Sequence, residues 1–565
     1  MSRFVPKAVT AMFASIALSC SCAPQRRPIS AATDASSAKR AANTKDAAST
    51  KGAGEAGTPC DPEAGDAECQ QGLSCSARLG GHCTAPCADR PCPSGVCVES
   101  PKMGQWCLGQ CTTDRQCPSR MTCDEHWDAC SPMVLPPRPP TCTDEAPLPR
   151  RSFSKPMQLS SGPRVDQYHT EPSAALTGDG SLVIAYIGHD VALPEAGRPQ
   201  PNGLGVAVVK PDGTVVRDRV MPTRRQNQFD PWLGSDRKGT VFATWLGFDG
   251  PTAPERNMHV GINRTDNGRD WAALPDAQYA ATDCPNEQTG CLDKPMLAIG
   301  PDASAPDHDA LYVAYYSAPA GGTRLVKSLD LGKRFGPSVA LSDGAYGDLS
   351  VDNTGVLHHV FAQASPVGPL TADGSYVGYT FSVDGGATVA TPFKVSRADQ
   401  QVPFYFSNPQ VTADPEHGVV YVVYPAGDAL GRWDIWLATS KDAGRTWRHT
   451  RVNDDASCAN HMLPAVALDP QTHELHVMWN ENRGGQGAVA YSRCQQGGAS
   501  CGPNERVSDA PFSAYRWVRH TPTWLGEYNA LVIDGPRRAL HAVWTQPVRE
   551  GEHDRTRIFH ARAAL

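Results

Sequence analysis

The sequence predicts an all-β protein in which a small disulfide-rich segment precedes a β-propeller of seven blades, with six blades as the alternative. A strand–turn–strand pattern recurs seven times after about residue 150, and a second turn containing Asp and Gly follows most copies. Thirteen of the 20 cysteines lie between Cys60 and Cys142. Gly (51) and Pro (49) are abundant, which favours turn-rich β structure over a helical bundle.

The N-terminus predicts export. Arg3 and Lys7 precede an apolar run from 9 to 18 that is too short to span a bilayer. Residues 1–19 are therefore expected to be a signal peptide. The run Ala-Leu-Ser before Cys20 resembles a bacterial lipoprotein signal, which implies lipidation of Cys20 and a place at the outer membrane or cell surface. The alternative is that the signal peptide is simply cleaved and the protein is secreted. Any membrane contact is expected only through the lipid anchor.

Residues 20–58 are expected to form a flexible linker, because Ala, Ser, Thr and Lys cannot bury enough apolar surface to offset ordering. Residues 59–145 form three loosely repeated units of four cysteines, and they are expected to be held by disulfides of roughly 2–4 kcal/mol each. Zinc is the alternative, but the segment has no Cys-x-x-Cys pair. The spacing weakly resembles Dickkopf-type cysteine-rich modules. The pairing within it, and the partners of Cys142 and Cys458, stay open.

Residues 150–565 carry the repeat that predicts the propeller. Each copy starts with a polar residue and often Pro, continues as a strand, turns at an Asp and ends in a strand with an aromatic residue. The spacing is roughly 50–65 residues, as expected for a four-stranded blade. The copies are 171–186, 230–245, 294–315, 347–361, 408–424, 463–479 and 527–544. Residues 157–160 resemble the fourth strands of other copies, so we expect them to complete the last blade and close the ring.

A second motif follows the strand pair in several copies. The full form is Ser440-Lys-Asp-Ala-Gly-Arg-Thr-Trp447, and close variants begin at Arg264, Ser328 and Ser382. This motif resembles the Asp box (BNR repeat) of the sialidase-like β-propeller superfamily. Its Asp can cap backbone N–H groups of a tight turn, its Gly permits positive φ, and its aromatic residue packs between sheets. The structural residues predicted are Asp266, Asp330, Asp384, Asp442, Gly268, Gly332, Gly386, Gly444, Trp271 and Trp447.

The remaining cysteines after the cysteine-rich segment are close in sequence. Cys284 with Cys291, and Cys494 with Cys501, are predicted to form local disulfides. In the sixth copy, Cys494 stands where the box has Asp, so the second bridge is expected to replace the box in holding that turn.

The first-hairpin turns and the boxes are expected to share one end of the propeller, called here the box end. The opposite end, the loop end, carries the richer loops. Arg225, Arg432, Arg483, Glu527 and Tyr528 are the weak candidates there for the Arg, Glu and Tyr groups of a sialidase site. The entry motif Arg-Ile-Pro of that family is absent.

The predicted function is therefore binding of a glycan or an extracellular protein through the loop end, and a glycoside hydrolase of the exo-sialidase type is the alternative. A net charge of −7 gives no indication of nucleic-acid binding. A monomer is expected. No cofactor or metal site is predicted, although calcium could bind near Asp454, Asp455 and His461. No Ser-His-Asp, Walker or His-Glu-x-x-His motif is present.

Overall fold

The protein is described by a computed structural model. It describes residues 74–76, 82–84, 96–100, 104–108, 121–124, 129–132, 148–150, 152–161, 168–190, 202–223, 227–249, 256–277, 291–363, 375–403, 408–427, 433–455, 459–483, 486–509, 511–512, 525–551 and 553–565. The predicted signal peptide, Cys20 and the linker lie outside these residues. Within the described residues, no helix is both long and apolar enough to cross a membrane.

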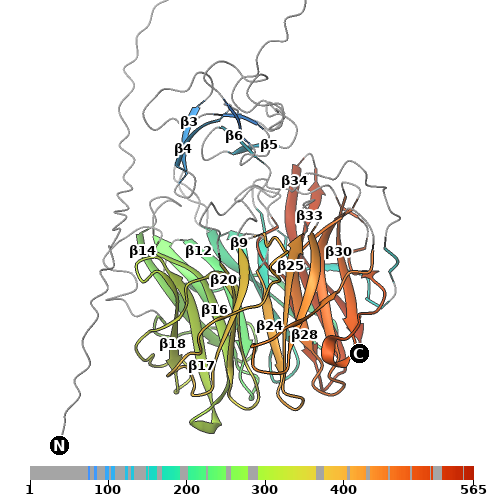
Figure 1. The fold of residues 1–565 in the computed structure, drawn as a ribbon. Coiled ribbons are helices and arrows are strands. Elements are labelled where there is room, and N and C mark those ends of the chain that lie inside the picture. The colour runs from blue at the N-terminus through green and yellow to red at the C-terminus, as the bar shows by residue number, and fades with distance from the viewer. Residues whose placement is uncertain are drawn as a thin grey trace, which may run out of the picture. The chain divides into compact units, whose positions relative to one another are not determined.

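The described part of residues 150–565 is a seven-bladed β-propeller, as predicted, which excludes the six-bladed alternative (Figure 1). Each blade is a four-stranded antiparallel sheet. Blade 1 contains β8 (Thr170–Leu176), β9 (Leu182–Asp190), β10 (Asn202–Val209) and β11 (Val215–Val220). Blade 2 contains β12 (Asn227–Ser235), β13 (Val241–Asp249), β14 (Arg256–Thr265) and β15 (Ala272–Ala273). Blade 3 contains β16 (Leu292–Asp302), β17 (Ala305–Ser317), β18 (Gly322–Ser328) and β19 (Val339–Ser342).

The next three blades repeat this order. Blade 4 contains β20 (Ala345–Val351), β21 (Leu357–Gln363), β22 (Tyr376–Ser382) and β23 (Phe393–Lys394). Blade 5 contains β24 (Gln410–Asp414), β25 (Val419–Gly427), β26 (Trp433–Ser440) and β27 (Arg448–Arg451). Blade 6 contains β28 (Asn460–Leu468), β29 (Leu475–Arg483), β30 (Gln486–Cys494) and β31 (Glu505–Arg506), with the short 3-10 helix η4 (Gln496–Gly498) before β31.

Blade 7 closes the ring. It contains β32 (Ala530–Asp534), β33 (Ala539–Glu550), β34 (His553–Ala564) and the early strand β7 (Met157–Gln158). Gln158 pairs with Phe559 and Met157 with His560, so the N-terminal strand of the domain supplies the outermost strand of its last blade. The predicted closure is present, and it gives blade 7 four strands, as many as each of the other blades has.

The apolar core lies between neighbouring blades. Val360 and Tyr379 of blade 4 pack with Val422 and Tyr424 of blade 5 in one buried cluster. Polar side chains of the innermost strands also cross the blade junctions. Asp348 of β20, for example, accepts the Val411 N–H of β24 at 3.1 Å. Burial raises the pKa of that carboxyl group to about 7.

The cysteine-rich segment contains three described hairpins. They are β1 (Ser74–Ser76) with β2 (His82–Thr84), β3 (Val96–Ser100) with β4 (Gly104–Leu108), and β5 (Met121–Asp124) with β6 (Ala129–Pro132). In each hairpin the third and fourth cysteines of one predicted unit stand opposite each other: Cys75 and Cys83, Cys97 and Cys107, Cys123 and Cys130. The threefold repeat in sequence is therefore a threefold repeat of hairpins.

The box turns hold the hairpins between the third and fourth strands. In blade 5 the Ser440 hydroxyl donates to Asp442 at 2.8 Å, and the Asp442 carboxylate accepts the Thr446 N–H at 2.9 Å. The hydrogen bonds from Thr446 lower the pKa of Asp442 to about 2. Trp447 then packs edge-on against Tyr379 of blade 4, with ring centroids 5.4 Å apart. The equivalent carboxylates of Asp330 and Asp384 accept the Arg334 and Thr388 N–H groups at 2.9 Å and 2.8 Å.

The turn in blade 2 differs from the expectation. Asn267 accepts the N–H groups of Arg269 and Asp270, and Thr265 caps the Gly268 N–H. Asp266, between Thr265 and Asn267, instead accepts the Thr240 hydroxyl at 2.7 Å. Thr265 and Asn267 therefore take the places that the prediction gave to Arg264 and Asp266. The polar residues that hold this turn stand one position later than predicted.

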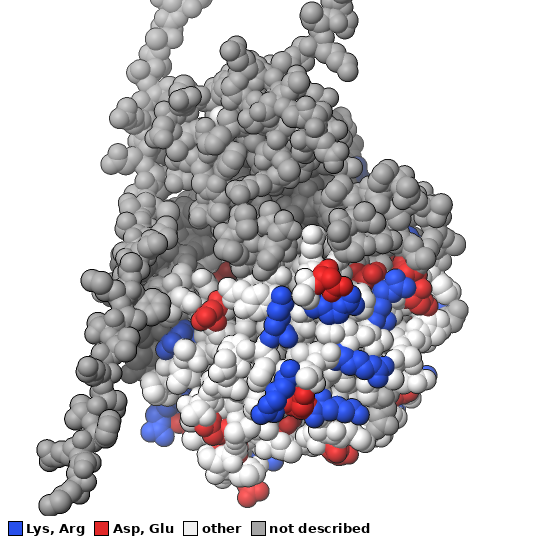
Figure 2. Space-filling view, in the orientation of Figure 1, with Lys and Arg blue, Asp and Glu red and all other residues white. Residues whose placement is uncertain are grey.

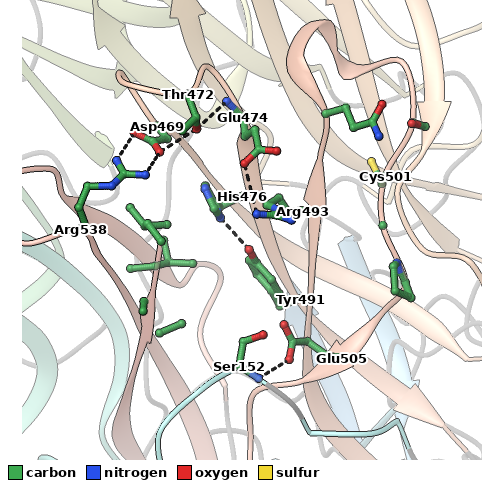
Figure 3. Close-up of a pocket in the computed structure, with 18 residues that line it drawn as sticks. Ser152, Asp469, Thr472, Glu474, His476, Tyr491, Arg493, Cys501, Glu505 and Arg538 are labelled. Atoms are coloured by element: carbon green, nitrogen blue, oxygen red, sulfur yellow. Dashed lines mark hydrogen bonds and ion pairs between the residues drawn. The ribbon is translucent and has the colours of Figure 1, made fainter.

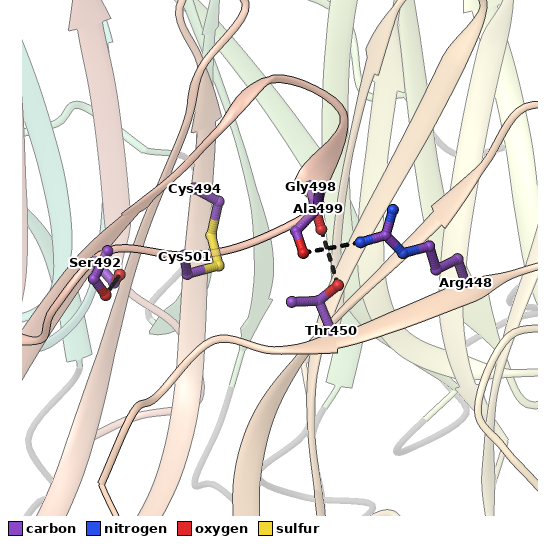
Figure 4. Close-up of a disulfide and its surroundings, with 8 residues drawn as sticks. Arg448, Thr450, Ser492, Cys494, Gly498, Ala499 and Cys501 are labelled. Carbon is purple, nitrogen blue, oxygen red and sulfur yellow. Dashed lines mark hydrogen bonds between the residues drawn. A yellow bond between two sulfur atoms is a disulfide. The ribbon is translucent and has the colours of Figure 1, made fainter.

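In blade 6 a disulfide joins Cys494 to Cys501, as predicted (Figure 4). The turn that it spans packs on β27 of blade 5. There Arg448 donates to the Ala499 carbonyl and the Thr450 hydroxyl donates to the Gly498 carbonyl, both at 2.8 Å. Cys291 is also disulfide-bonded, while its predicted partner Cys284 lies outside the described residues.

Replacing Gly444 by alanine is expected to lower the free energy of unfolding by about 2–3 kcal/mol, measured by denaturant titration. Its φ is 86°, and an added Cβ would stand 2.5 Å from Cδ1 of Tyr379. Gly418→Ala is the matched control, because Gly418 has φ 63° but nothing within 4 Å of the added Cβ. The control should lose only the conformational part, about 1 kcal/mol. Equal losses in the two variants would show that the Tyr379 contact is unimportant.

Candidate functional site

The innermost strand of each of the first six blades begins at the loop end with an unusual backbone conformation. One residue there lies in the left-handed region, and in most blades a β-bulge interrupts the pairing with the second strand at the same point. Such conformations cost on the order of 1 kcal/mol or more in non-glycine residues and cluster at functional sites. The residues are Glu171 (φ 53°), Asp230 (52°), Lys294 (46°), Tyr346 (44°), Asn408 (20°) and Leu463 (51°).

Side chains from four blades meet at this level. The Lys294 ammonium of blade 3 lies 2.9 Å from Asp230 Oδ1 of blade 2 and 2.6 Å from Glu527 Oε2, which precedes blade 7. Its distance to Glu171 Oε1 of blade 1 is 3.6 Å. Four blades of a ring can share one contact point only at the central axis. Glu171, Asp230, Lys294, Glu527 and Tyr528 are called the axial cluster below.

The axial cluster is buried and carries more acidic than basic groups. Burial is the main reason why the pKa of Glu171 is well above its ordinary value, which favours the protonated form of this carboxyl group. Burial alone would lower the pKa of Lys294, but the carboxyl groups of Asp230, Glu171 and Glu527 raise it well above 10.5. A charged lysine therefore faces three carboxyl groups, and burial favours the protonated form of one of them, Glu171.

Aromatic rings surround the lysine. Its ammonium lies 5.4 Å from the Tyr346 ring centroid and 5.7 Å from that of Tyr528, which is within the range of cation–π contacts. The Tyr528 hydroxyl donates to the Pro231 carbonyl at 3.0 Å, and the ring packs against Trp232. Burial raises the pKa of Tyr528 well above 10, so the group remains a neutral phenol.

A second group of charged side chains lies at the loop end of blades 5 and 6. His461 is fully buried; its Nδ1 lies 2.8 Å from the Trp433 carbonyl oxygen and its Nε2 3.3 Å from Asp455. Burial alone would lower the pKa of His461, but Asp455 and further carboxylates raise it to about 9. Arg483 donates to Glu481 at 2.9 Å and to Asp455 at 3.1 Å. The His461 imidazolium and the Arg483 guanidinium thus share the carboxylates of Asp455 and Glu481.

The structure separates the predicted site residues. Glu527 and Tyr528 belong to the axial cluster, and Arg483 belongs to the second group, where two carboxylates neutralise it. Arg225 and Arg432 lie outside the described residues. At the predicted calcium position, Asp455 already holds the positively charged His461 and Arg483, and Asp454 accepts the Asn504 N–H at 3.1 Å. Two positive neighbours make this a poor place for a further cation.

The prediction missed Glu171, Asp230 and Lys294 as site residues. The signal was present, because each precedes a proline at the start of a repeat: Glu171-Pro, Asp230-Pro and Lys294-Pro. These dipeptides indicated only where strands begin. That the first residue of each pair reaches the axis depends on the bulge and the left-handed conformation, which the repeat pattern does not reveal.

A cavity of about 590 Å³ lies between blades 6 and 7 (Figure 3). Its polar lining is largely paired internally. Arg538 contacts Asp469 at 2.7 Å, Arg493 contacts Glu474 at 3.3 Å, and the Tyr491 hydroxyl lies 2.6 Å from His476 Nδ1. Because these polar groups pair with one another, the axial cluster is the stronger candidate for function.

No family model matches the chain, and no curated protein matches it. Among solved structures, a protein of unknown function from Dyadobacter fermentans is similar at 13% identity, 74% coverage of this chain, 99% of the other and a TM-score of 0.43. The α-L-arabinanase of Penicillium chrysogenum in complex with arabinobiose is similar at 13% identity, with 73% of this chain and 98% of the other covered and a TM-score of 0.40. The Hadza microbial sialidase Hz136 is similar at 12% identity, with 77% of this chain and 98% of the other covered and a TM-score of 0.39.

Proposed function

We propose that this chain is an exported protein, anchored through Cys20 or secreted, whose propeller binds neutral glycans at its loop end. The observation that carries the proposal is the composition of the axial cluster, in which carboxyl groups outnumber the single ammonium and tyrosines lie beside them. Carboxyl oxygens accept sugar hydroxyls, and aromatic rings pack on the apolar faces of sugar rings. An excess of carboxyl groups disfavours an anionic sugar.

The exo-sialidase alternative has less support. A sugar carboxylate needs unpaired guanidinium groups, whereas the described candidate Arg483 is bound to Glu481 and Asp455. A tyrosine nucleophile needs a lowered pKa, whereas burial raises that of Tyr528. On the side of the propeller that Figure 2 shows, Lys and Arg lie among Asp and Glu, whereas carboxyl groups predominate in the axial cluster.

A second candidate function is cleavage of a neutral glycan. Burial raises the pKa of Glu171 and so favours the protonated state that a general acid needs, and the neighbouring carboxyl groups of Asp230 and Glu527 could serve as base or nucleophile. Product analysis by chromatography after prolonged incubation separates cleavage from binding. If the chain cleaves the glycan, Glu171→Gln should abolish turnover and retain binding.

The binding proposal is tested with the full mature chain on an array of neutral and sialylated oligosaccharides, followed by calorimetry on the best ligand. We expect retention of neutral glycans, and a loss of at least about tenfold in affinity for Glu527→Gln. Asp309→Asn is the matched control, since Asp309 lies in β17 of blade 3 and pairs with Arg237 in the β12–β13 turn of blade 2, at the box end. Circular dichroism checks that each variant is folded. Preference for sialylated ligands, or retention of an extracellular protein without any glycan, would contradict the proposal.

A further inference from the structure

Two histidines and an aspartate from neighbouring blades meet at the box end. Asp414 ends β24, and His417 lies three residues later in the same turn of blade 5. His473 lies in the turn between β28 and β29 of blade 6, where its left-handed conformation (φ 58°) is well suited to a tight turn. The Asp414 side chain is almost fully buried, whereas that of His473 is 17% exposed and that of His417 43% exposed.

The ring nitrogens of both histidines point at one carboxylate oxygen. Nδ1 of His417 lies 2.8 Å from Asp414 Oδ2, and Nδ1 of His473 lies 2.9 Å from the same atom. The three potential ligand atoms all lie within 4.8 Å of one another. Zinc binds nitrogen and oxygen ligands at about 2.0–2.2 Å, so shifts of a few tenths of an ångström and a small ring rotation would place an ion among them.

A fourth residue supports a metal at this place rather than a hydrogen-bonded trio alone. Nε2 of His473, on the far side of its ring, lies 3.4 Å from Glu416 Oε2. Histidine ligands of metals usually donate their other ring N–H to a carboxylate, which fixes the tautomer. Without a metal, Nδ1 of His473 donates its proton to Asp414. A bound metal would take the place of that proton, and Glu416 is positioned to accept the proton that the neutral ring then carries on Nε2.

We infer that Asp414, His417 and His473 bind a divalent transition-metal ion, with Zn²⁺ as the best match. Two imidazole nitrogens and one carboxylate oxygen suit zinc, and they suit calcium poorly, because calcium requires six or more oxygen ligands. Water would supply the fourth ligand. Since His473 comes from blade 6 and the other two ligands from blade 5, the ion would join the two blades.

The test uses the full chain with its disulfides intact, freed of metal by dialysis against a chelator. Calorimetric titration with Zn²⁺ is compared between the native chain, His417→Gln and His473→Asn; Asn is chosen because it tolerates positive φ. His308→Gln, at an exposed position of β17, is the matched control. Co²⁺ absorption gives a second readout, because tetrahedral sites produce intense visible bands.

We expect the native chain and the control to bind one equivalent of Zn²⁺ that both ligand variants lose. Glu416→Gln should bind about tenfold more weakly. Zn²⁺ should raise the unfolding midpoint of the native chain but not those of the ligand variants. Metal-free unfolding curves establish that each variant is folded. Equal Zn²⁺ binding by the native chain and both ligand variants, or the absence of binding by the native chain, would overturn the inference.

Discussion

Replacing Lys294 by methionine is expected to lower the free energy of unfolding by about 3–5 kcal/mol. The Lys294 side chain is 7% exposed, and its ammonium is shared by Asp230, Glu527 and Glu171. Methionine preserves most of the volume but leaves the carboxyl groups buried without a counter-charge. Removing one partner of a buried ion pair costs far more than the pair contributes, because the remaining charge stays desolvated.

The measurement is denaturant unfolding at about pH 8 and about pH 5.5, with Lys394→Met as the control. Lys394 is exposed at the edge strand β23, so its loss should be within about 0.5 kcal/mol. The destabilisation by Lys294→Met should shrink at the lower pH, where the unpaired carboxyl groups take up protons. Adding Glu527→Gln should restore part of the stability. A loss below about 1 kcal/mol at both pH values would show that Lys294 does not neutralise the cluster.

The second large effect expected is a fall in stability below about pH 6.5. Burial lowers the pKa of His359, His476 and His541 to about 4, and that of His560 to about 3. The unfolded chain, with ordinary histidine pKa values near 6.5, then binds more protons than the folded protein between about pH 6.5 and 4. The stability from these groups is complete above about pH 6.5 and is lost as the pH falls.

Each such histidine contributes a slope of up to about 1.4 kcal/mol per pH unit in that window. Asp348, whose pKa burial raises to about 7, opposes part of this slope, since its protonation relieves a buried charge. His461 acts in the opposite sense at higher pH. Its pKa is raised to about 9, so its contribution is complete below about pH 6.5 and is lost as the pH rises through about 9. Stability should therefore be greatest near neutral pH.

Unfolding free energies across this pH range check the prediction. His359→Gln should reduce the acid slope by about one histidine's share, because glutamine can still hydrogen-bond with Ser342 and the Asp348 carbonyl but does not titrate there. His308→Gln should leave the slope unchanged, since His308 is exposed. A stability that stays constant between about pH 7 and 5 would contradict the buried, neutral state of these histidines.

The local patterns of the chain were sufficient to predict its architecture. Alternating strands, Asp-containing turns and the box residues around Asp442 are each encoded within a few positions, and the short spacing of Cys494 and Cys501 indicated their bridge. The fourth strand at 157–158 could be matched because it resembles other fourth strands. One box was misaligned at Asp266, because Asn267 with Thr265 makes the equivalent hydrogen bonds.

The sites depend instead on residues far apart in sequence. Lys294 meets Asp230 across 64 positions, and His473 meets Asp414 across 59. The sequence by itself determined the blades, their turns and the closure of the ring, because these follow from short-range hydrogen bonding and periodic burial. Only the tertiary structure decided which side chains reach the axis and which turns touch, because curvature around the ring, bulges and left-handed residues bring distant positions together. The repeat thus predicts the scaffold, and closure of the ring creates the acidic axial cluster on which the proposed glycan binding depends.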